Sequence, residues 1–142
     1  MRYPNEAQFC FVEGSDLLVL PDPRIGTLLA GRYVIEEVIG EGGMATVYRA
    51  RHKLVERPVA VKIMNPMLAT DPVVRERFRR EARSAQKIAH PNIIEIHDQG
   101  DTEDGTAFIV MELLGGEALA SVIARGPMDV DRAVGCMIQI AR

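Results

Sequence analysis

The chain has 142 residues, 17 of them lysine or arginine and 20 aspartate or glutamate, which gives a formal net charge of −3. Hydrophobic residues make up 47% and charged residues 26% of the sequence, a balance typical of one soluble domain rather than a disordered chain. No apolar run approaches the ~20 residues that cross a bilayer, and we expect no signal peptide. The mild acidity gives no reason to expect nucleic-acid binding. Two distant cysteines, Cys10 and Cys136, favour a cytoplasmic location over a disulfide scaffold.

Residues 1–30 lack periodicity and contain three prolines, so we predict a leader that is dispensable to the folded domain. Three strands rich in β-branched residues are predicted next, at 33–39, 45–51 and 59–64. The first two flank a run of glycines, which indicates a hairpin.

The strongest helix pattern comes next. It is predicted to begin at Asp71, which can cap a helix, and Pro72 suits the first helical position. Apolar residues then recur at helical spacing until His90-Pro91 ends the pattern. Two further strands are predicted at 93–97 and 107–111, with a polar loop at 101–105. Two helices follow, at 117–125 and 129–142.

This order predicts an α+β fold, namely a five-stranded antiparallel sheet with one packed helix, followed by two more helices. Adjacent strands in sequence argue against a doubly wound parallel sheet.

The glycine turn, Gly40 to Ala45, resembles G-x-G-x-x-G with alanine in the third position. A dinucleotide fold requires a helix after the glycines, and a P-loop requires Gly-Lys-Ser/Thr and then a helix. A strand pattern follows here instead, so both are disfavoured. A hairpin whose backbone amides cover phosphates remains, and so does a flexible hairpin without a ligand.

Two opposite charges lie at positions where apolar residues are expected. Lys62 interrupts an otherwise apolar strand, and Glu81 falls within the apolar arc of the predicted helix. We predict that the two form an ion pair beside the glycine turn, since a buried charge requires a partner. The alternative is that Lys62 extends past the sheet edge while Glu81 pairs with Arg77.

Five segments together resemble the small, nucleotide-binding lobe of a bacterial, eukaryotic-type (Hanks-type) Ser/Thr protein kinase. They occur in the family's order, at 39–48, 59–62, 78–82, 90–93 and 110–114. The resemblance covers about residues 32–142, so we expect residues 31–142 to be the N-terminal part of a kinase domain that functions in bacterial signalling.

The resemblance implies that ATP is the cofactor and assigns roles to individual residues. Lys62 would contact the α- and β-phosphates, and Glu81 would orient it. The backbone of the glycine turn would cover the phosphates: Gly40, Glu41, Gly42, Gly43, Met44 and Ala45. The adenine would lie between Ile39, Val47 and Ala60, with Met111 as gatekeeper, Glu112 and Leu114 as hinge, and Glu117 near the ribose.

The sequence contains no H-R-D, D-F-G or A-P-E motif, so we expect a truncated kinase or an incomplete gene model. This chain alone would be inactive, and Mg²⁺ would bind only in a completed kinase that phosphorylates an unknown protein substrate. A different hypothesis is a noncatalytic module that pairs with another kinase lobe. A third is an unrelated α+β domain with a chance glycine hairpin.

In the leader, Cys10 to Leu17 resembles half of a zinc-ribbon-like knuckle, but the partner cysteines are missing and we expect no metal site. The helix arginines from Arg75 to Arg83 are interpreted as a solvated face.

Overall fold

The structure is a computed structural model that describes residues 21–142. The strands are β1 (Leu28–Leu29), β2 (Tyr33–Glu41), β3 (Ala45–His52), β4 (Pro58–Met64), β5 (Ile96–Asp101) and β6 (Ala107–Glu112). The helices are the short 3-10 helix η1 (Pro66–Leu68), α1 (Pro72–Gln86), α2 (Leu119–Ala124) and α3 (Val130–Ala141). The predicted α+β fold is confirmed. The predicted half-knuckle at Cys10 to Leu17 lies outside the described residues.

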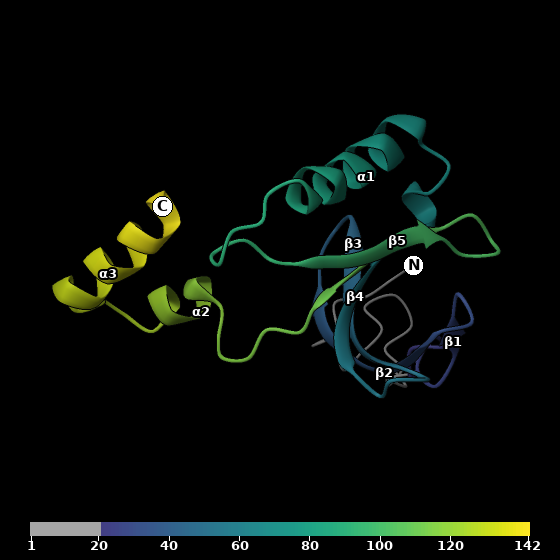
Figure 1. Ribbon diagram of the computed structural model, residues 1–142, viewed down its shortest axis with the longest axis horizontal. Helices are drawn as coiled ribbons and strands as arrows, with labels where there is room; N and C mark the ends of the chain where they lie inside the picture. The colour runs from purple at the N-terminus through teal and green to yellow at the C-terminus, as the bar shows by residue number, and fades with distance from the viewer. Residues whose placement is uncertain (1–20) are drawn as a thin grey trace, which may run out of the picture.

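The sheet is antiparallel throughout and curls, with the strand order β1-β2-β3-β4-β6-β5 (Figure 1). It has six strands rather than the predicted five, because Leu28 and Leu29 pair with Val34 and Tyr33 of β2. Two residues are too few to show a strand period. The last part of the predicted leader therefore joins the sheet, and Leu29 is buried.

The turn between α1 and β5 begins earlier and ends later than predicted. The backbone N–H of Ile88 donates to the Ala85 carbonyl at 3.2 Å, so the helix tightens and closes after Gln86. The Ile93 N–H donates to the His90 carbonyl at 3.0 Å, which forms a second turn. Strand β5 consequently begins at Ile96, three residues after the predicted start.

Alternation along the strands divides the core into two groups on opposite faces of the sheet. The inner cluster fills the concave face and consists of Leu29, Tyr33, Ile35, Tyr48, Ala50, Val59, Val61, Ile63, Phe108 and Val110. The helix-facing cluster consists of Ala45, Met64, Phe78, Ala82, Ala107 and Ile109. As predicted, β4 directs Val61 to the inner cluster and Met64 to the helix-facing cluster.

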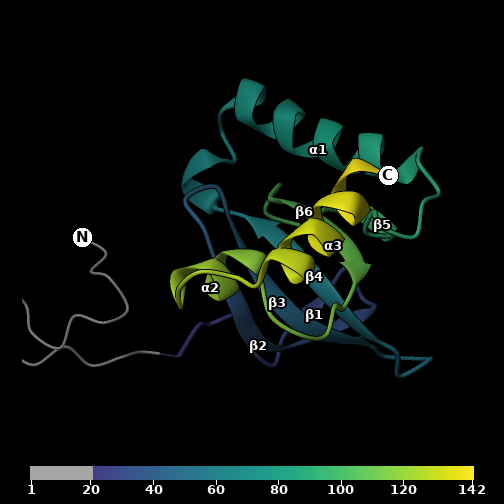
Figure 2. The ribbon, with the colours of Figure 1, turned by 90° about the vertical axis from the view of Figure 1, so that its left-hand side faces the viewer.

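Helix α1 begins as its sequence predicts. The Asp71 carboxylate accepts hydrogen bonds from the backbone N–H groups of Val73 and Val74, and Pro72 occupies the first turn. Phe78 and Ala82 are buried against the sheet. Figure 2 shows α1 lying along one side of the sheet.

Helices α2 and α3 extend beyond the sheet (Figure 1) and are joined through Gly126, whose φ of 130° suits glycine. Asn92, in the turn after α1, donates from Nδ2 to the Gln139 carbonyl of α3 at 2.8 Å. Within residues 21–142, no helix is both long enough and apolar enough to span a membrane.

Candidate nucleotide-binding site

The predicted ion pair between β4 and α1 is present. Lys62 Nζ lies 3.3 Å from Glu81 Oε1, and the same ammonium lies 5.7 Å from the centre of the Phe78 ring. The Lys62 side chain is 28% exposed and that of Glu81 is 67% exposed. A pair this accessible to water contributes little to stability. Its main physical effect is to hold the ammonium at one place on the sheet face.

The glycine turn closes with a hydrogen bond from the Gly42 N–H to the Ala45 carbonyl at 2.9 Å. None of its glycines has a positive φ, so backbone strain does not explain them. What they provide is bare backbone that a phosphate oxygen can approach. Ala45, which replaces the third glycine, is buried in the helix-facing cluster and pairs with Met64. Its methyl group therefore has a packing role.

The predicted adenine-contacting residues share one face of the sheet. Val47 is the strand partner of Lys62, and Ala60 is the partner of Met111. Since side chains alternate along β4, Ala60 lies on the same face as Lys62. The register therefore brings four separately predicted residues together.

A β-bulge determines where Ile39 lies. Val38 pairs with Tyr48 and Gly40 pairs with Val47, so Ile39 is the additional residue between them. Val38 packs partly against the inner cluster, whereas the Ile39 side chain is 47% exposed. The bulge was not predicted, because a strand pattern carries no signal for one extra residue.

The predicted hinge begins at Glu112, the last residue of β6. The Glu112 N–H donates to the Glu95 carbonyl at 3.0 Å, and the Glu112 carboxylate accepts the Glu95 N–H at 2.8 Å. Leu114 is exposed. Glu117 forms an ion pair at 2.6 Å with Arg125, the residue directly after α2, so the structure places its carboxylate beside the end of that helix. Neither partnership was predicted.

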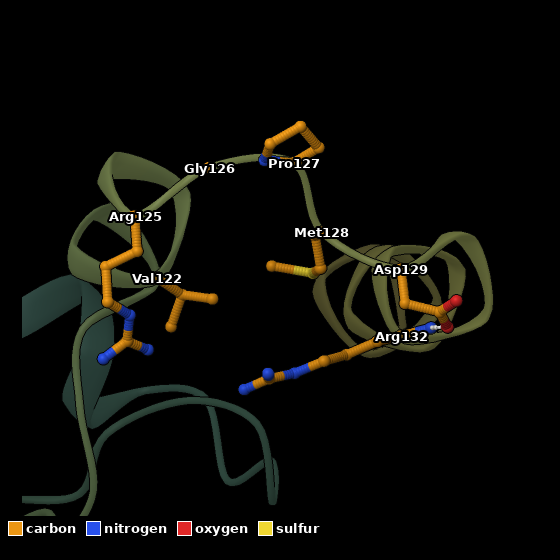
Figure 3. Close-up of a pocket in the computed structure, with 7 residues that line it drawn as sticks. All are labelled: Val122, Arg125, Gly126, Pro127, Met128, Asp129 and Arg132. Atoms are coloured by element: carbon orange, nitrogen blue, oxygen red, sulfur yellow. Dashed lines mark hydrogen bonds between the residues drawn. The ribbon is translucent and has the colours of Figure 1, made fainter.

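Two hollows lie outside this face. One, of about 220 Å³, lies between α2 and α3, with Arg125, Met128 and Arg132 in its wall (Figure 3). The other, of about 180 Å³, lies beside α1 and β5 and includes Arg79, Arg83 and Gln99. Neither includes a residue predicted to contact the nucleotide.

The α1 arginines are more than the solvated face that was predicted. Arg75 lies 3.4 Å from Asp101 at the end of β5, and Arg79 pairs with the same carboxylate. These contacts attach α1 to the sheet and so help to place Glu81. Asp101 was predicted only as a loop residue.

Among residues 21–142, no three His, Cys, Asp or Glu side chains are grouped to hold a metal ion.

Comparison with known proteins identifies this arrangement. The sequence-family model of the protein kinase domain matches residues 33–142. The chain belongs to the protein kinase domain family. The predicted resemblance is thereby confirmed for the part of the chain from β2 onward.

The chain is similar to several bacterial kinases. It is 44% identical over 121 residues to the serine/threonine-protein kinase PknH of Mycobacterium tuberculosis, covering 84% of this chain and 19% of PknH. It is 40% identical over 125 residues to the serine/threonine-protein kinase PknA of the same organism, covering 84% of this chain and 29% of PknA. The chain therefore spans less than a third of the length of either relative.

A solved structure of a kinase domain is also similar to this chain. The M. tuberculosis PknI kinase domain superimposes with a TM-score of 0.68 at 28% identity, covering 82% of this chain and 47% of that chain. The six-stranded sheet, α1 and the two following helices together thus form the N-terminal part of a kinase domain.

Proposed function

We propose that residues 31–142 are the ATP-binding part of a Ser/Thr protein kinase. The completed enzyme would transfer the γ-phosphoryl group of ATP to a serine or threonine of a protein. The observation that carries this proposal is the Lys62–Glu81 pair on the sheet face beside the glycine turn. The protein substrate and the cytoplasmic location stay predictions.

The residues of this chain suit ATP in three ways. The backbone from Gly40 to Gly43 lets phosphate oxygens approach closely because three of its four residues have no side chain, and the Lys62 ammonium offers a charge held in place by Glu81. Apolar side chains of Ile39, Val47, Ala60 and Met111 offer a surface for the adenine, with the backbone of Glu112 and Leu114 at its edge. Mg²⁺, when bound in a completed kinase, would neutralise phosphate charge.

Glu117 pairs with Arg125 through Oε1, so a ribose hydroxyl and this guanidinium would share one carboxylate. We therefore expect nucleotide binding to compete with this ion pair. The Arg125→Ala variant should bind an ATP analogue at least as tightly as the unchanged chain.

Nucleotide binding tests the proposal directly. A fluorescent ATP analogue is titrated into the 142-residue chain and into the Lys62→Met, Glu81→Gln and Lys53→Met variants. We expect weak binding that Lys62→Met abolishes and Glu81→Gln reduces. Lys53, an exposed lysine between β3 and β4, is the matched control and should leave affinity unchanged. Equal binding by the Lys62→Met chain would contradict the assigned role of Lys62.

Phosphoryl transfer requires a second experiment, since the 142 residues contain no catalytic loop. We expect no labelled phosphate in a protein substrate when this chain is incubated with ATP and Mg²⁺. A chimera that joins residues 1–142 to the corresponding large lobe of PknH should transfer phosphate, and its Lys62→Met variant should not. An inactive but folded chimera would count against the kinase assignment.

A second candidate function rests on α3. Val134, Met137, Ile138 and Ile140 are all more than half exposed, and such a surface favours pairing with another protein. The chain would then act as a noncatalytic module that binds another kinase lobe. Light scattering after gel filtration discriminates between the two, since a pairing module should bind an intact kinase even when Lys62 is methionine.

A further inference from the structure

The segment before the matched kinase domain is attached to the sheet by an ordered set of hydrogen bonds. The Gly26 N–H donates to the Ile35 carbonyl at 2.7 Å, and the Ile35 N–H donates to the Thr27 carbonyl at 3.0 Å. Asp22 accepts the Arg24 N–H through Oδ1 at 2.9 Å. The segment is thus held along β2, on the side of the sheet away from α1.

Asp22 also holds a tyrosine on the neighbouring strand. The Tyr48 hydroxyl donates to Asp22 Oδ2 at 2.6 Å, and Arg24 Nη1 donates to the Tyr48 oxygen at 3.4 Å. The Tyr48 side chain is completely buried in the inner cluster. Burial and the bond to Asp22 raise the pKa of Tyr48, so the hydroxyl stays a donor further into the alkaline range than an exposed tyrosine does. Asp22 is the acceptor that this buried donor requires.

The position of Tyr48 connects this bond to the candidate site. Tyr48 pairs with Val38, the residue directly before the bulge, and its neighbour Val47 pairs with Gly40 directly after it. The bulge directs Ile39 outward, and the glycine turn begins one residue later. A shift of Tyr48 along β3 would move both sides of this bulge.

We propose that Asp22 is a positioning residue: by accepting the Tyr48 hydroxyl it fixes β3 opposite the bulge, and so holds Ile39 and the glycine turn in place. The effect on the turn stands by itself, whereas the effect on ATP rests on the proposed function. Without the Asp22 carboxylate, the Tyr48 hydroxyl loses its acceptor and β3 loses its attachment to the segment before β1. The segment at 22–29 is then part of the site although it precedes the matched domain.

Hydrogen exchange of the Gly42 amide tests the proposal, because that amide closes the turn. It is measured in the 142-residue chain and in the Asp22→Ala, Asp22→Asn and Tyr48→Phe variants. We expect exchange roughly fivefold faster in Asp22→Ala and in Tyr48→Phe, the factor that corresponds to one net hydrogen bond. Asp22→Asn keeps an acceptor oxygen and should stay close to the unchanged chain. In the Asp22→Ala/Tyr48→Phe double variant, the Gly42 amide should exchange no faster than in either single variant, since each substitution removes the same hydrogen bond.

Val110→Ala is the matched control. Val110 is fully buried in the same inner cluster but lies on β6. The Val110→Ala variant should have a lower Tm, but its Gly42 amide should not exchange faster relative to amides of the sheet core. Three outcomes would each overturn the positioning role. They are equally fast exchange of the Gly42 amide in Val110→Ala, additive effects in the Asp22→Ala/Tyr48→Phe double variant, and an unchanged Gly42 exchange rate in Asp22→Ala.

Nucleotide affinity separates this proposal from the proposed function. We expect Asp22→Ala to weaken binding of the ATP analogue by a similar factor. If the unchanged chain binds no ATP analogue, the proposed function fails, and the Gly42 rates still decide whether Asp22 positions the turn. If ATP binds and Asp22→Ala alters neither affinity nor the Gly42 rate, the positioning role fails by itself.

Discussion

The sheet with α1 and the pair α2–α3 differ in how they bury apolar side chains. Sixteen side chains form the inner and helix-facing clusters, and every one belongs to the sheet, to its strand ends or to α1. Neither α2 nor α3 has a buried residue, and α3 exposes several large apolar side chains. Stability in the described part of the chain therefore comes from the sheet and α1, and substitutions there should have far larger effects than those in α3.

The largest expected effect comes from Phe78, whose side chain is 1% exposed at the centre of the helix-facing cluster. Phe78→Ala should lower the free energy of unfolding by about 3–5 kcal/mol, because it leaves a cavity between α1 and the sheet. Urea unfolding followed by circular dichroism measures this. A loss below 1 kcal/mol would show that α1 is not firmly packed.

Leu29 should have the next largest effect, which reverses the prediction that residues 1–30 are dispensable. Its side chain is 7% exposed and belongs to the inner cluster. Leu29→Ala should cost about 2–3 kcal/mol of unfolding free energy, and the exposed neighbour Leu28 is the matched control. Thermal melts compare the two. Equal Tm values for both variants would restore the original interpretation of the leader.

Alkaline pH should weaken the sheet, because burial and a carboxylate partner raise the pKa of both Tyr33 and Tyr48. A raised folded-state pKa means that this stability is complete below the unfolded value of about 10. It is lost as the pH rises through the folded value. Tm measured from pH 8 to 11 should fall above pH 10, and less steeply in Tyr48→Phe. An identical slope in that variant would contradict the coupling.

The smallest effect is expected in α3, where the Met137 side chain is 61% exposed. Met137→Ser should change the unfolding free energy by no more than about 0.5 kcal/mol. The same variant should reduce any self-association, since it removes apolar surface. Gel filtration and thermal melts provide both measurements. A large loss of Tm would mean that α3 is packed more firmly than its exposure indicates.

Sequence reasoning located the elements with clear periods and the charges that interrupted them. The strand pattern around Lys62 and the helix pattern around Glu81 together predicted the ion pair, because each carries a misplaced charge of opposite sign. The cap at Asp71 marked the start of α1 correctly.

The features that were missed depend on single residues or on contacts distant in sequence. The two residues Leu28–Leu29 are too few to show a period, and the bulge at Ile39 has no recognisable pattern in the sequence. Asp22 and Tyr48 are 26 residues apart, and neither is unusual in its own segment. The pairing of Asp101 with the α1 arginines likewise becomes visible only once β5 is placed beside the helix.

The hydrogen bond between Asn92 and Gln139 has a mechanical consequence. The chain between β6 and α2 joins the two parts of the molecule covalently, and this bond joins them a second time, from the turn after α1 to α3. Asn92 is itself held, since its N–H donates to His90 Nδ1 at 3.1 Å. Breaking this hydrogen bond would leave α2 and α3 attached to the sheet through the covalent connection alone.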